Sequence, residues 1–139
     1  MTTIVIDASV AVNWLIREAG EESAMSLLKL YADKRIALVA PRQIVDEVAS
    51  ALSKLHRRKV ITTVEAESAF RNFENRRPLL VEDPSLVPAA FELCLRHRIS
   101  FWDSLYLAVA IEKRADLVTA DQRLYRSVSR HYPFVRLLS

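Results

Sequence analysis

Strand-like and helix-like stretches alternate along this chain of 139 residues, and the alternation constrains its fold more than any other feature. Short apolar runs rich in β-branched residues predict strands at residues 3–7, 35–40, 79–82, 116–119 and 134–138. Helical periodicity fills the intervals, at residues 9–18, 21–32, 41–58, 62–76, 86–97, 101–113 and 121–131. Strands that alternate with helices are joined by right-handed crossovers and run parallel. We therefore expect an α/β fold in one domain, residues 1–139, with a central, mostly parallel sheet and helices on both faces.

Individual residues mark several helix ends. Gly20 is expected to separate the first two helices, and Pro41 to occupy the first position of the third. Two pairs have the spacing of capping boxes, Thr62 with Glu65 and Ser100 with Asp103.

Glycine and cysteine are scarce, which excludes several kinds of site. Gly20 is the only glycine, so the chain has no glycine-rich loop of the kind that cradles phosphate groups. Cys94 is the only cysteine, so neither an internal disulfide nor a cysteine-based zinc cluster can form. The longest apolar run, residues 105–111, is too short to cross a bilayer, and the N-terminus lacks the basic start of a secretory signal. We expect a cytoplasmic protein that does not bind or span a membrane.

Four acidic residues stand where the predicted strands and helices meet. Asp7 ends the first strand, Asp121 follows the strand at 116–119, and Asp103 lies in the first turn of the helix at 101–113. Glu47 lies near the start of the helix that follows the second strand. Ligands of parallel sheets bind beyond the carboxyl ends of the strands, so this edge is the place to search for a site. All four acids are expected at this edge.

Helical phase separates Glu47 from its neighbour Asp46. With about 100° per residue, Ile44, Val48 and Leu52 share one apolar arc of their helix. Glu47 falls at the margin of this arc, whereas Asp46 points almost the opposite way. Glu47 is therefore expected to face the sheet edge and Asp46 the solvent.

Simpler roles for these acids remain open from the residues alone. Asp7 and Asp121 fit helix N-caps, and Asp103 fits its capping box. However, the helix at 101–113 is apolar on almost every side, and a buried carboxylate must be paired, hydrogen-bonded or bound to a metal. Clustered carboxylates repel by up to ~4 kcal/mol for a pair about 4 Å apart. A divalent cation that prefers oxygen ligands, Mg²⁺ or Mn²⁺, would offset this repulsion and suits phosphodiester chemistry.

Four segments, in this order, carry a family resemblance: Asp7-Ala-Ser9, Pro41 with Glu47, residues 101–110 (FWDSLYLAVA) and residues 117–124 (LVTADQRL). Together they resemble the PIN-domain family, and most closely the VapC-type ribonuclease toxins of prokaryotic toxin–antitoxin pairs. The resemblance covers nearly the whole chain. It implies a Rossmann-like three-layer sandwich and a metal-dependent endoribonuclease that hydrolyses RNA phosphodiester bonds.

The resemblance also implies roles for single residues. The acidic quartet of the family corresponds to Asp7, Glu47, Asp103 and Asp121. The hydroxyl of Ser9 would help to hold the metal ion or its water, and Thr119 is a second candidate of this kind. The hypothesis is that Asp7 and Asp103 are the main ligands of one Mg²⁺ or Mn²⁺ ion, while Glu47 and Asp121 complete its shell or hold a second ion.

Basic residues gather in stretches that contain no acid. Residues 48–64 and all residues after Asp121 are free of acids, and the net charge is +3. Singly, such residues solvate a surface or favour helix ends; together they could hold an RNA backbone without reading its sequence. The members are Lys54, Arg57, Arg58, Lys59, Arg76, Arg77, Arg96, Arg98, Arg123, Arg126, Arg130 and Arg136.

The resemblance implies two protein partners, a cognate antitoxin and a second copy of the chain in a homodimer. The apolar faces of the first two helices and of the Pro41 helix are candidate surfaces for the antitoxin. Two other functions remain open: a PIN nuclease of RNA processing or quality control outside any toxin system, and an RNA-binding module whose acids only cap helices.

Overall fold

The computed structural model describes residues 1–16 and 21–138 of the chain, built around a five-stranded sheet in the order β3-β2-β1-β4-β5. Every neighbouring pair of strands is parallel. The strands are β1 (Thr2–Ile6), β2 (Ile36–Pro41), β3 (Leu79–Val81), β4 (Asp116–Thr119) and β5 (Val135–Leu137). The predicted α/β fold is confirmed, and each strand lies within a residue or two of its predicted place.

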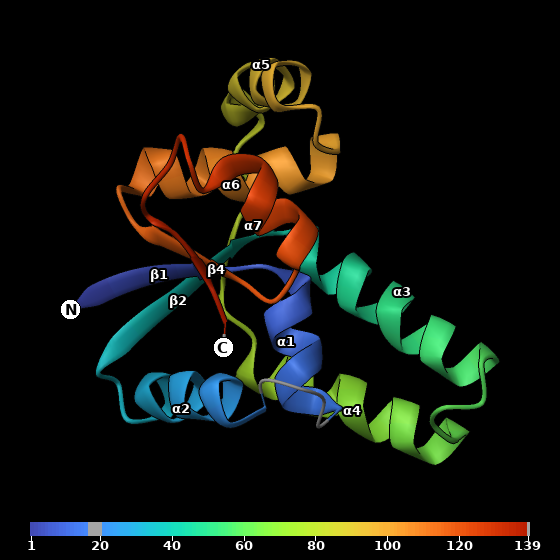
Figure 1. Ribbon diagram of the computed structural model, residues 1–139. Helices are drawn as coiled ribbons and strands as arrows, with labels where there is room; N and C mark the ends of the chain where they lie inside the picture. The colour runs from blue at the N-terminus through green and yellow to red at the C-terminus, as the bar shows by residue number, and fades with distance from the viewer. Residues whose placement is uncertain (17–20, 139) are drawn as a thin grey trace.

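Helices cover both faces of this sheet (Figure 1). On one face lie α1 (Ala8–Leu15) and α2 (Glu21–Ala32); on the other lies α6 (Phe101–Lys113), with α5 (Val87–His97) packed outside it. The long helices α3 (Ile44–Arg57) and α4 (Thr63–Arg76) pack against each other and extend past the end of the sheet. A short 3₁₀ turn, Pro84–Leu86, precedes α5, and α7 (Gln122–Val128) connects β4 to β5.

The core forms where the sheet meets α1 and α6. Val5 and Leu117 on the two central strands are fully buried, as are Tyr106 and Leu107 on α6. Trp14 contributes from α1, as expected for a core aromatic. Among the residues that the structure describes, no helix is both long and apolar enough to cross a membrane.

Pro41 is a correction to the predicted boundaries. It closes β2 opposite Val81 instead of opening α3, which begins at Ile44. Proline is tolerated there because the last residue of a strand can lack a ladder N–H. The next residue, Arg42, donates its N–H to Val81 O at 2.9 Å and so continues the pairing.

Other helix ends follow the expected signals only in part. Thr62 and Glu65 form the full predicted capping box of α4. At α6 the Asp103 N–H donates to Ser100 Oγ at 3.0 Å, which is one half of such a box. The last predicted helix, α7, ends at Val128 and not at residue 131, and residues 129–131 form a turn in which the N–H groups of His131 and Tyr132 donate to Val128 O. The first helix ends at Leu15, with Ile16 as its C-cap, three residues before its predicted end, and the break expected at Gly20 lies outside the described residues.

Basic residues occupy left-handed positions that glycine would favour. Arg98 caps α5 with φ 52° and Arg114 caps α6 with φ 53°, while Lys34 and Lys59 follow α2 and α3 with φ 58° and 60°. A side chain in this conformation costs about 1 kcal/mol relative to glycine. A cation at a helix C-terminus recovers part of this cost through the helix dipole.

Candidate active site

The two central strands bring Asp7 and Asp121 to one edge of the sheet. Asp7 directly follows β1 and Asp121 lies two residues after β4, and these strands are parallel neighbours. From β1 the strand order runs to β2 and β3 on one side of the sheet, and β4 and β5 lie on the other side of β1, so the direction of the strand order reverses there. The point between β1 and β4 is therefore the switch point of the topology, where open α/β sheets leave a crevice for ligands.

Asp7 is held by hydroxyl groups from two segments. Its side chain is only 5% exposed. Its Oδ1 accepts from Ser9 Oγ at 2.5 Å and from the Val10 N–H at 3.3 Å, which makes it the N-cap of α1. Its Oδ2 accepts from the hydroxyl of Thr119, the last residue of β4. Ser9 Oγ in turn accepts from the Ala120 N–H at 2.9 Å. Ser9 and Thr119 thus lie against Asp7 and tie it to β4.

The environment of Asp7 opposes its negative charge. Burial raises the pKa of this carboxyl to about 6, even though the hydrogen bonds from Ser9, Thr119 and Val10 act in the other direction. Repulsion from Asp103 adds to the increase. A nearby cation would relieve both effects.

Glu47 reaches toward the same region from α3, as its helical phase predicts. It is half-buried, and its Oε2 accepts from the Tyr106 hydroxyl at 2.8 Å. Burial raises the pKa of Glu47, with further contributions from Asp103 and Asp46, against the hydrogen bonds of Tyr106 and Gln43. Asp46, the adjacent acid, is exposed and pairs with Arg42 at 2.8 Å.

Asp103 and Asp121 line one cavity of about 220 Å³. Burial raises the pKa of Asp103, and Asp121 adds to this effect. Asp121 is exposed and caps α7, since its Oδ1 accepts from the N–H groups of Arg123 at 2.9 Å and Leu124 at 3.2 Å. Asp7 and Asp121 thus both act as helix N-caps, and the charge of each is also coupled to that of Asp103.

Asp103 is the common neighbour of the quartet, because its charge acts on Asp7 and Glu47 and it is itself affected by Asp121. Within residues 1–16 and 21–138, no group of three or more His, Cys, Asp or Glu side chains is placed so that it could hold a metal ion. An open arrangement of carboxylates still fits Mg²⁺, which keeps several waters and takes only one or two carboxylates. Three carboxyls with raised pKa values and all-oxygen donors match a hard divalent cation.

The sequence did not reveal the hydrogen bond between Tyr106 and Glu47. Tyr106 is fully buried on α6, and its hydroxyl also fixes the Glu47 carboxylate. A tyrosine within an otherwise aliphatic buried helix needs a partner for its hydroxyl, and this was the available signal. A second bridge, Gln43 Nε2 to Trp102 O at 2.7 Å, joins the starts of α3 and α6.

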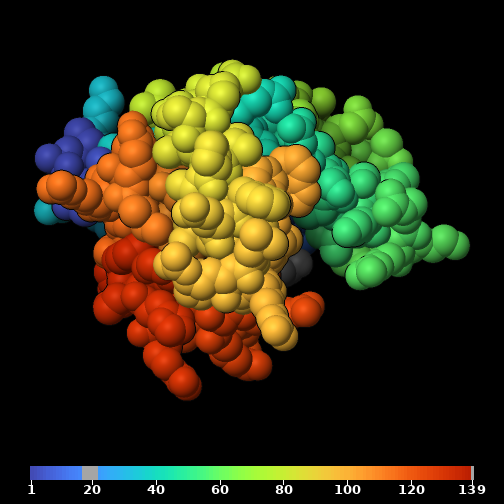
Figure 2. All heavy atoms as spheres, turned by 90° about the horizontal axis from the view of Figure 1, so that it is seen from above, coloured from blue at the N-terminus to red at the C-terminus, as the bar shows by residue number. Residues whose placement is uncertain are grey.

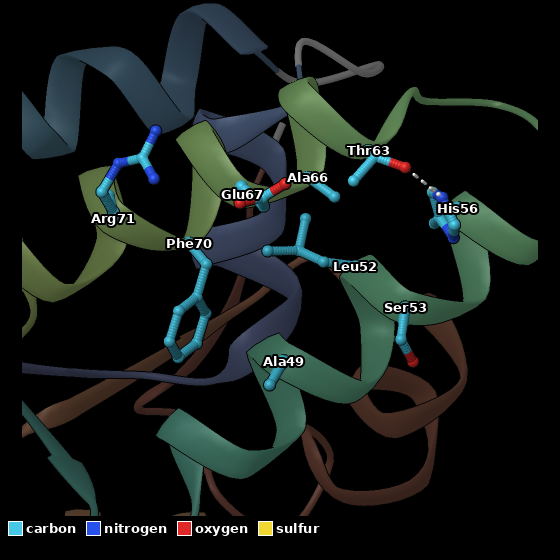
Figure 3. Close-up of a pocket in the computed structure, with 9 residues that line it drawn as sticks. All are labelled: Ala49, Leu52, Ser53, His56, Thr63, Ala66, Glu67, Phe70 and Arg71. Atoms are coloured by element: carbon cyan, nitrogen blue, oxygen red, sulfur yellow. Dashed lines mark hydrogen bonds between the residues drawn. The ribbon is translucent and has the colours of Figure 1, made fainter.

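A separate groove of about 450 Å³ lies between α3 and α4 (Figure 3). Leu52, Ala66 and Phe70 line it, and His56 Nε2 lies 2.9 Å from Thr63 Oγ1 at one end. Phe73 is fully buried in the core, whereas Phe70 is partly buried against the core and lines this groove. None of the four acids lines the groove.

Together these features define an α/β protein with a carboxylate-lined site at the switch point of its sheet. The PIN domain profile matches residues 4–128. Ribonuclease VapC1 of Mycobacterium tuberculosis, from strains CDC 1551 and H37Rv, is 30% identical over 129 residues, which are 89% of this chain and 90% of the relative. The chain therefore belongs to the PIN-domain family, and its likeness is to the VapC-type ribonuclease toxins.

Solved structures of lower identity share the fold. VapC20 of Mycobacterium tuberculosis, described as a sarcin-ricin loop cleaving toxin, matches with a TM-score of 0.62 at 21% identity, over 90% of this chain and 95% of its own. VapBC2 of Rickettsia felis, bound to a fragment of its promoter DNA, matches with a TM-score of 0.69 at 18% identity, over 98% of this chain and 97% of the matched chain. The predicted three-layer PIN architecture is thus confirmed.

Proposed function

We propose that this chain is a metal-dependent endoribonuclease that acts as the toxin of a toxin–antitoxin system. The observation that carries the proposal is that the charge of Asp103 is coupled to those of Asp7, Glu47 and Asp121, which come from distant parts of the chain, and that Asp7, Glu47 and Asp103 have raised pKa values. Such an arrangement is unfavourable for folding alone, because like charges repel and buried carboxylates lose solvation. Its cost is explained if the site holds a cation.

The proposed ligands of Mg²⁺ or Mn²⁺ are Asp7 and Asp103, with Glu47 and Asp121 completing the shell or holding a second ion. When bound, such an ion supplies activation of water and stabilisation of charge on a phosphate group. The chain's own part is to hold these oxygens in place: Ser9 and Thr119 orient Asp7, and Tyr106 orients Glu47. The raised pKa of Glu47 suits it to accept a proton from the attacking water.

Cleavage of total RNA by the purified protein tests the proposal. We expect fragments in Mg²⁺ or Mn²⁺ and none with a chelator. Asp103→Asn should lower the cleavage rate at least a hundredfold, since it removes a ligand without changing its size. Glu47→Gln and Asp46→Asn form a matched pair on adjacent positions, one facing the site and one exposed. The first should lose most activity, and the second should stay within twofold of the wild type.

Several outcomes would count against this proposal. Cleavage that persists in the chelator or in Asp103→Asn would exclude the metal mechanism. Salt-dependent RNA binding with no cleavage in either metal would favour the RNA-binding module. Induced expression should also arrest growth and produce new RNA ends, neither of which Asp103→Asn should cause; cut RNA with normal growth would favour a processing nuclease instead of a toxin.

We further propose an antitoxin partner and a homodimer, as the likeness to VapC-type toxins implies. The groove between α3 and α4 is the surface that best suits an antitoxin segment, because apolar side chains such as Leu52, Ala66 and Phe70 form much of its lining. The outer face of α5 suits a second copy: Val87, Phe91 and Leu95, four residues apart, are 44%, 54% and 64% exposed. Figure 2 shows α5, in yellow to gold, at the surface of its face of the molecule. Analytical ultracentrifugation measures the self-association directly.

A further inference from the structure

The cavity beside Asp103 and Asp121 has a second wall that is positively charged. Arg98, at the C-terminus of α5, and Arg123, in the first turn of α7, line the same 220 Å³ space as the two acids. The hydroxyl-bearing residues Ser100 and Ser127 line it too. The elements that supply these residues are separate in sequence and meet only through the fold.

Neither arginine forms an ion pair with Asp103 or Asp121. Among residues 1–16 and 21–138, no ion pair within 4 Å involves the guanidinium of Arg98 or Arg123. The charge of Arg123 nevertheless acts on Asp103, where it opposes the increase in pKa. The carboxylates and the guanidinium groups thus line one small cavity without forming ion pairs. This leaves room for a ligand that contacts both.

The net charge of the cavity becomes positive when a cation is bound. Two aspartates and two arginines cancel. A divalent ion on the carboxylates would leave the cavity with a charge of about +2, and an anion would then be attracted to the arginine wall. Guanidinium groups bind phosphate through two parallel hydrogen bonds, and serine hydroxyls add neutral donors.

We propose that Arg98 and Arg123 form a phosphate-binding subsite, in which a backbone phosphate of the RNA is held next to the acidic centre. The proposal rests on the proposed nuclease function for its ligand, a single-stranded RNA phosphodiester. Arg98 and Arg123 are positioning residues here: they fix the strand so that its neighbouring phosphodiester lies at the carboxylates. The subsite recognises the backbone and not the bases, so it contributes affinity more than sequence preference.

The backbone of Arg98 makes a sharp variant possible. Arg98 has φ 52° and ψ 41°, a conformation that glycine adopts at no cost, so Arg98→Gly removes the guanidinium without straining the fold. Arg114→Gly is the matched control: Arg114 has φ 53° and ψ 47° and caps the opposite end of α6. It lies eleven residues after Asp103, about 16 Å along the helix axis. Both variants remove one positive charge and relieve the same backbone conformation.

Equilibrium binding of a labelled single-stranded RNA of about ten nucleotides tests the subsite. It is measured by fluorescence anisotropy over a series of salt concentrations, in Mg²⁺, with Glu47→Gln in every protein to suppress cleavage while Asp7 and Asp103, the main proposed metal ligands, stay in place. We expect Arg98→Gly and Arg123→Gln each to weaken binding about tenfold. Each should also reduce the slope of log K against log salt by about 0.7, the value for one lost phosphate contact on a single strand. Arg114→Gly should bind within twofold of the parent, and Arg123→Lys should restore the slope.

In the proteins that retain Glu47, the same substitutions should raise KM about tenfold and change kcat less than threefold. If the wild type cleaves RNA but Arg98→Gly and Arg123→Gln bind as Arg114→Gly does, the subsite is wrong and the nuclease function stands. If affinity falls while the salt slope stays the same, the arginines do not contact phosphate, and the subsite is again wrong. If the wild type cleaves no RNA, the nuclease function fails, and the binding series still decides whether the arginine wall holds RNA.

Discussion

Replacing Asp7 with asparagine should make the metal-free protein more stable at neutral pH. Asp7 is 5% exposed, and its pKa is about 6 in the folded protein because burial disfavours its charge. Asparagine has nearly the same shape and can accept from Ser9 and Val10 as the carboxylate does. The substitution therefore removes an unfavourable charge while it keeps most of the packing.

The size of the effect follows from the two pKa values of the group. In the unfolded chain the pKa of Asp7 returns to its ordinary value of 3.8, and the difference from about 6 corresponds to about 3 kcal/mol. At pH 7.5 the carboxyl is ionised in both states, so the folded state bears the whole cost. As the pH falls through 6 the folded protein takes up the proton first, and the cost declines. Below pH 3.8 the group is neutral in both states and the cost is gone.

Urea unfolding in a chelator, at several pH values between 4 and 8, measures the difference. We expect Asp7→Asn to be about 2 to 3 kcal/mol more stable than the wild type at pH 7.5, with a Tm increase of roughly 6 to 10 °C, and nearly equal to it at pH 4. Asp46→Asn, at an exposed acid paired with Arg42, should change stability by less than about 0.5 kcal/mol. An Asp7→Asn protein that is less stable at pH 7.5, or whose advantage does not depend on pH, would refute the reasoning.

Two further substitutions test the packing around the site. Tyr106→Phe leaves Glu47 without its buried hydroxyl partner and should cost about 1 to 2 kcal/mol in urea unfolding, whereas an unchanged stability would mean that the 2.8 Å contact contributes nothing. Arg114→Gly should stabilise the protein by about 0.5 to 1 kcal/mol, because glycine relieves the left-handed cap of α6; a loss of stability would show that the arginine side chain outweighs the backbone.

The fold was predictable because its signals are local. Periods of two and of 3.6 residues separate strands from helices, and a parallel sheet follows from their alternation. The boundaries that failed depend on partners distant in sequence. Pro41 looks like the start of a helix until its pairing opposite Val81 is known. The last helix is an exception, because it ends three residues before its predicted position in a local turn at residues 129–131.

The sequence predicts at which sheet edge and on which helix face the acids lie, but not the contacts that they make. Helical phase distinguishes Glu47 from Asp46, and strand order places Asp7 beside the segment that carries Asp121. The hydrogen bond from the Tyr106 hydroxyl to Glu47 joins residues 59 positions apart, and no local sequence pattern predicts such a pair. The arginine wall is similar: Arg98 appears in the sequence as one basic residue among many, and only its place beside Asp103 gives it a specific role.

The topology of the sheet explains why opposite charges meet at this one edge. Chain segments leave β1 and β4 at neighbouring points and then diverge to different helices, so the crevice between them is bordered by residues from both halves of the chain. The strand ends and the start of α6 contribute the acids, because those positions also suit helix caps. The end of α5 contributes Arg98, because a helix C-terminus favours a cation. Capping preferences that stabilise individual helices thus bring acids and an arginine to the same crevice, and the proposed divalent ion and RNA phosphate would satisfy both charges.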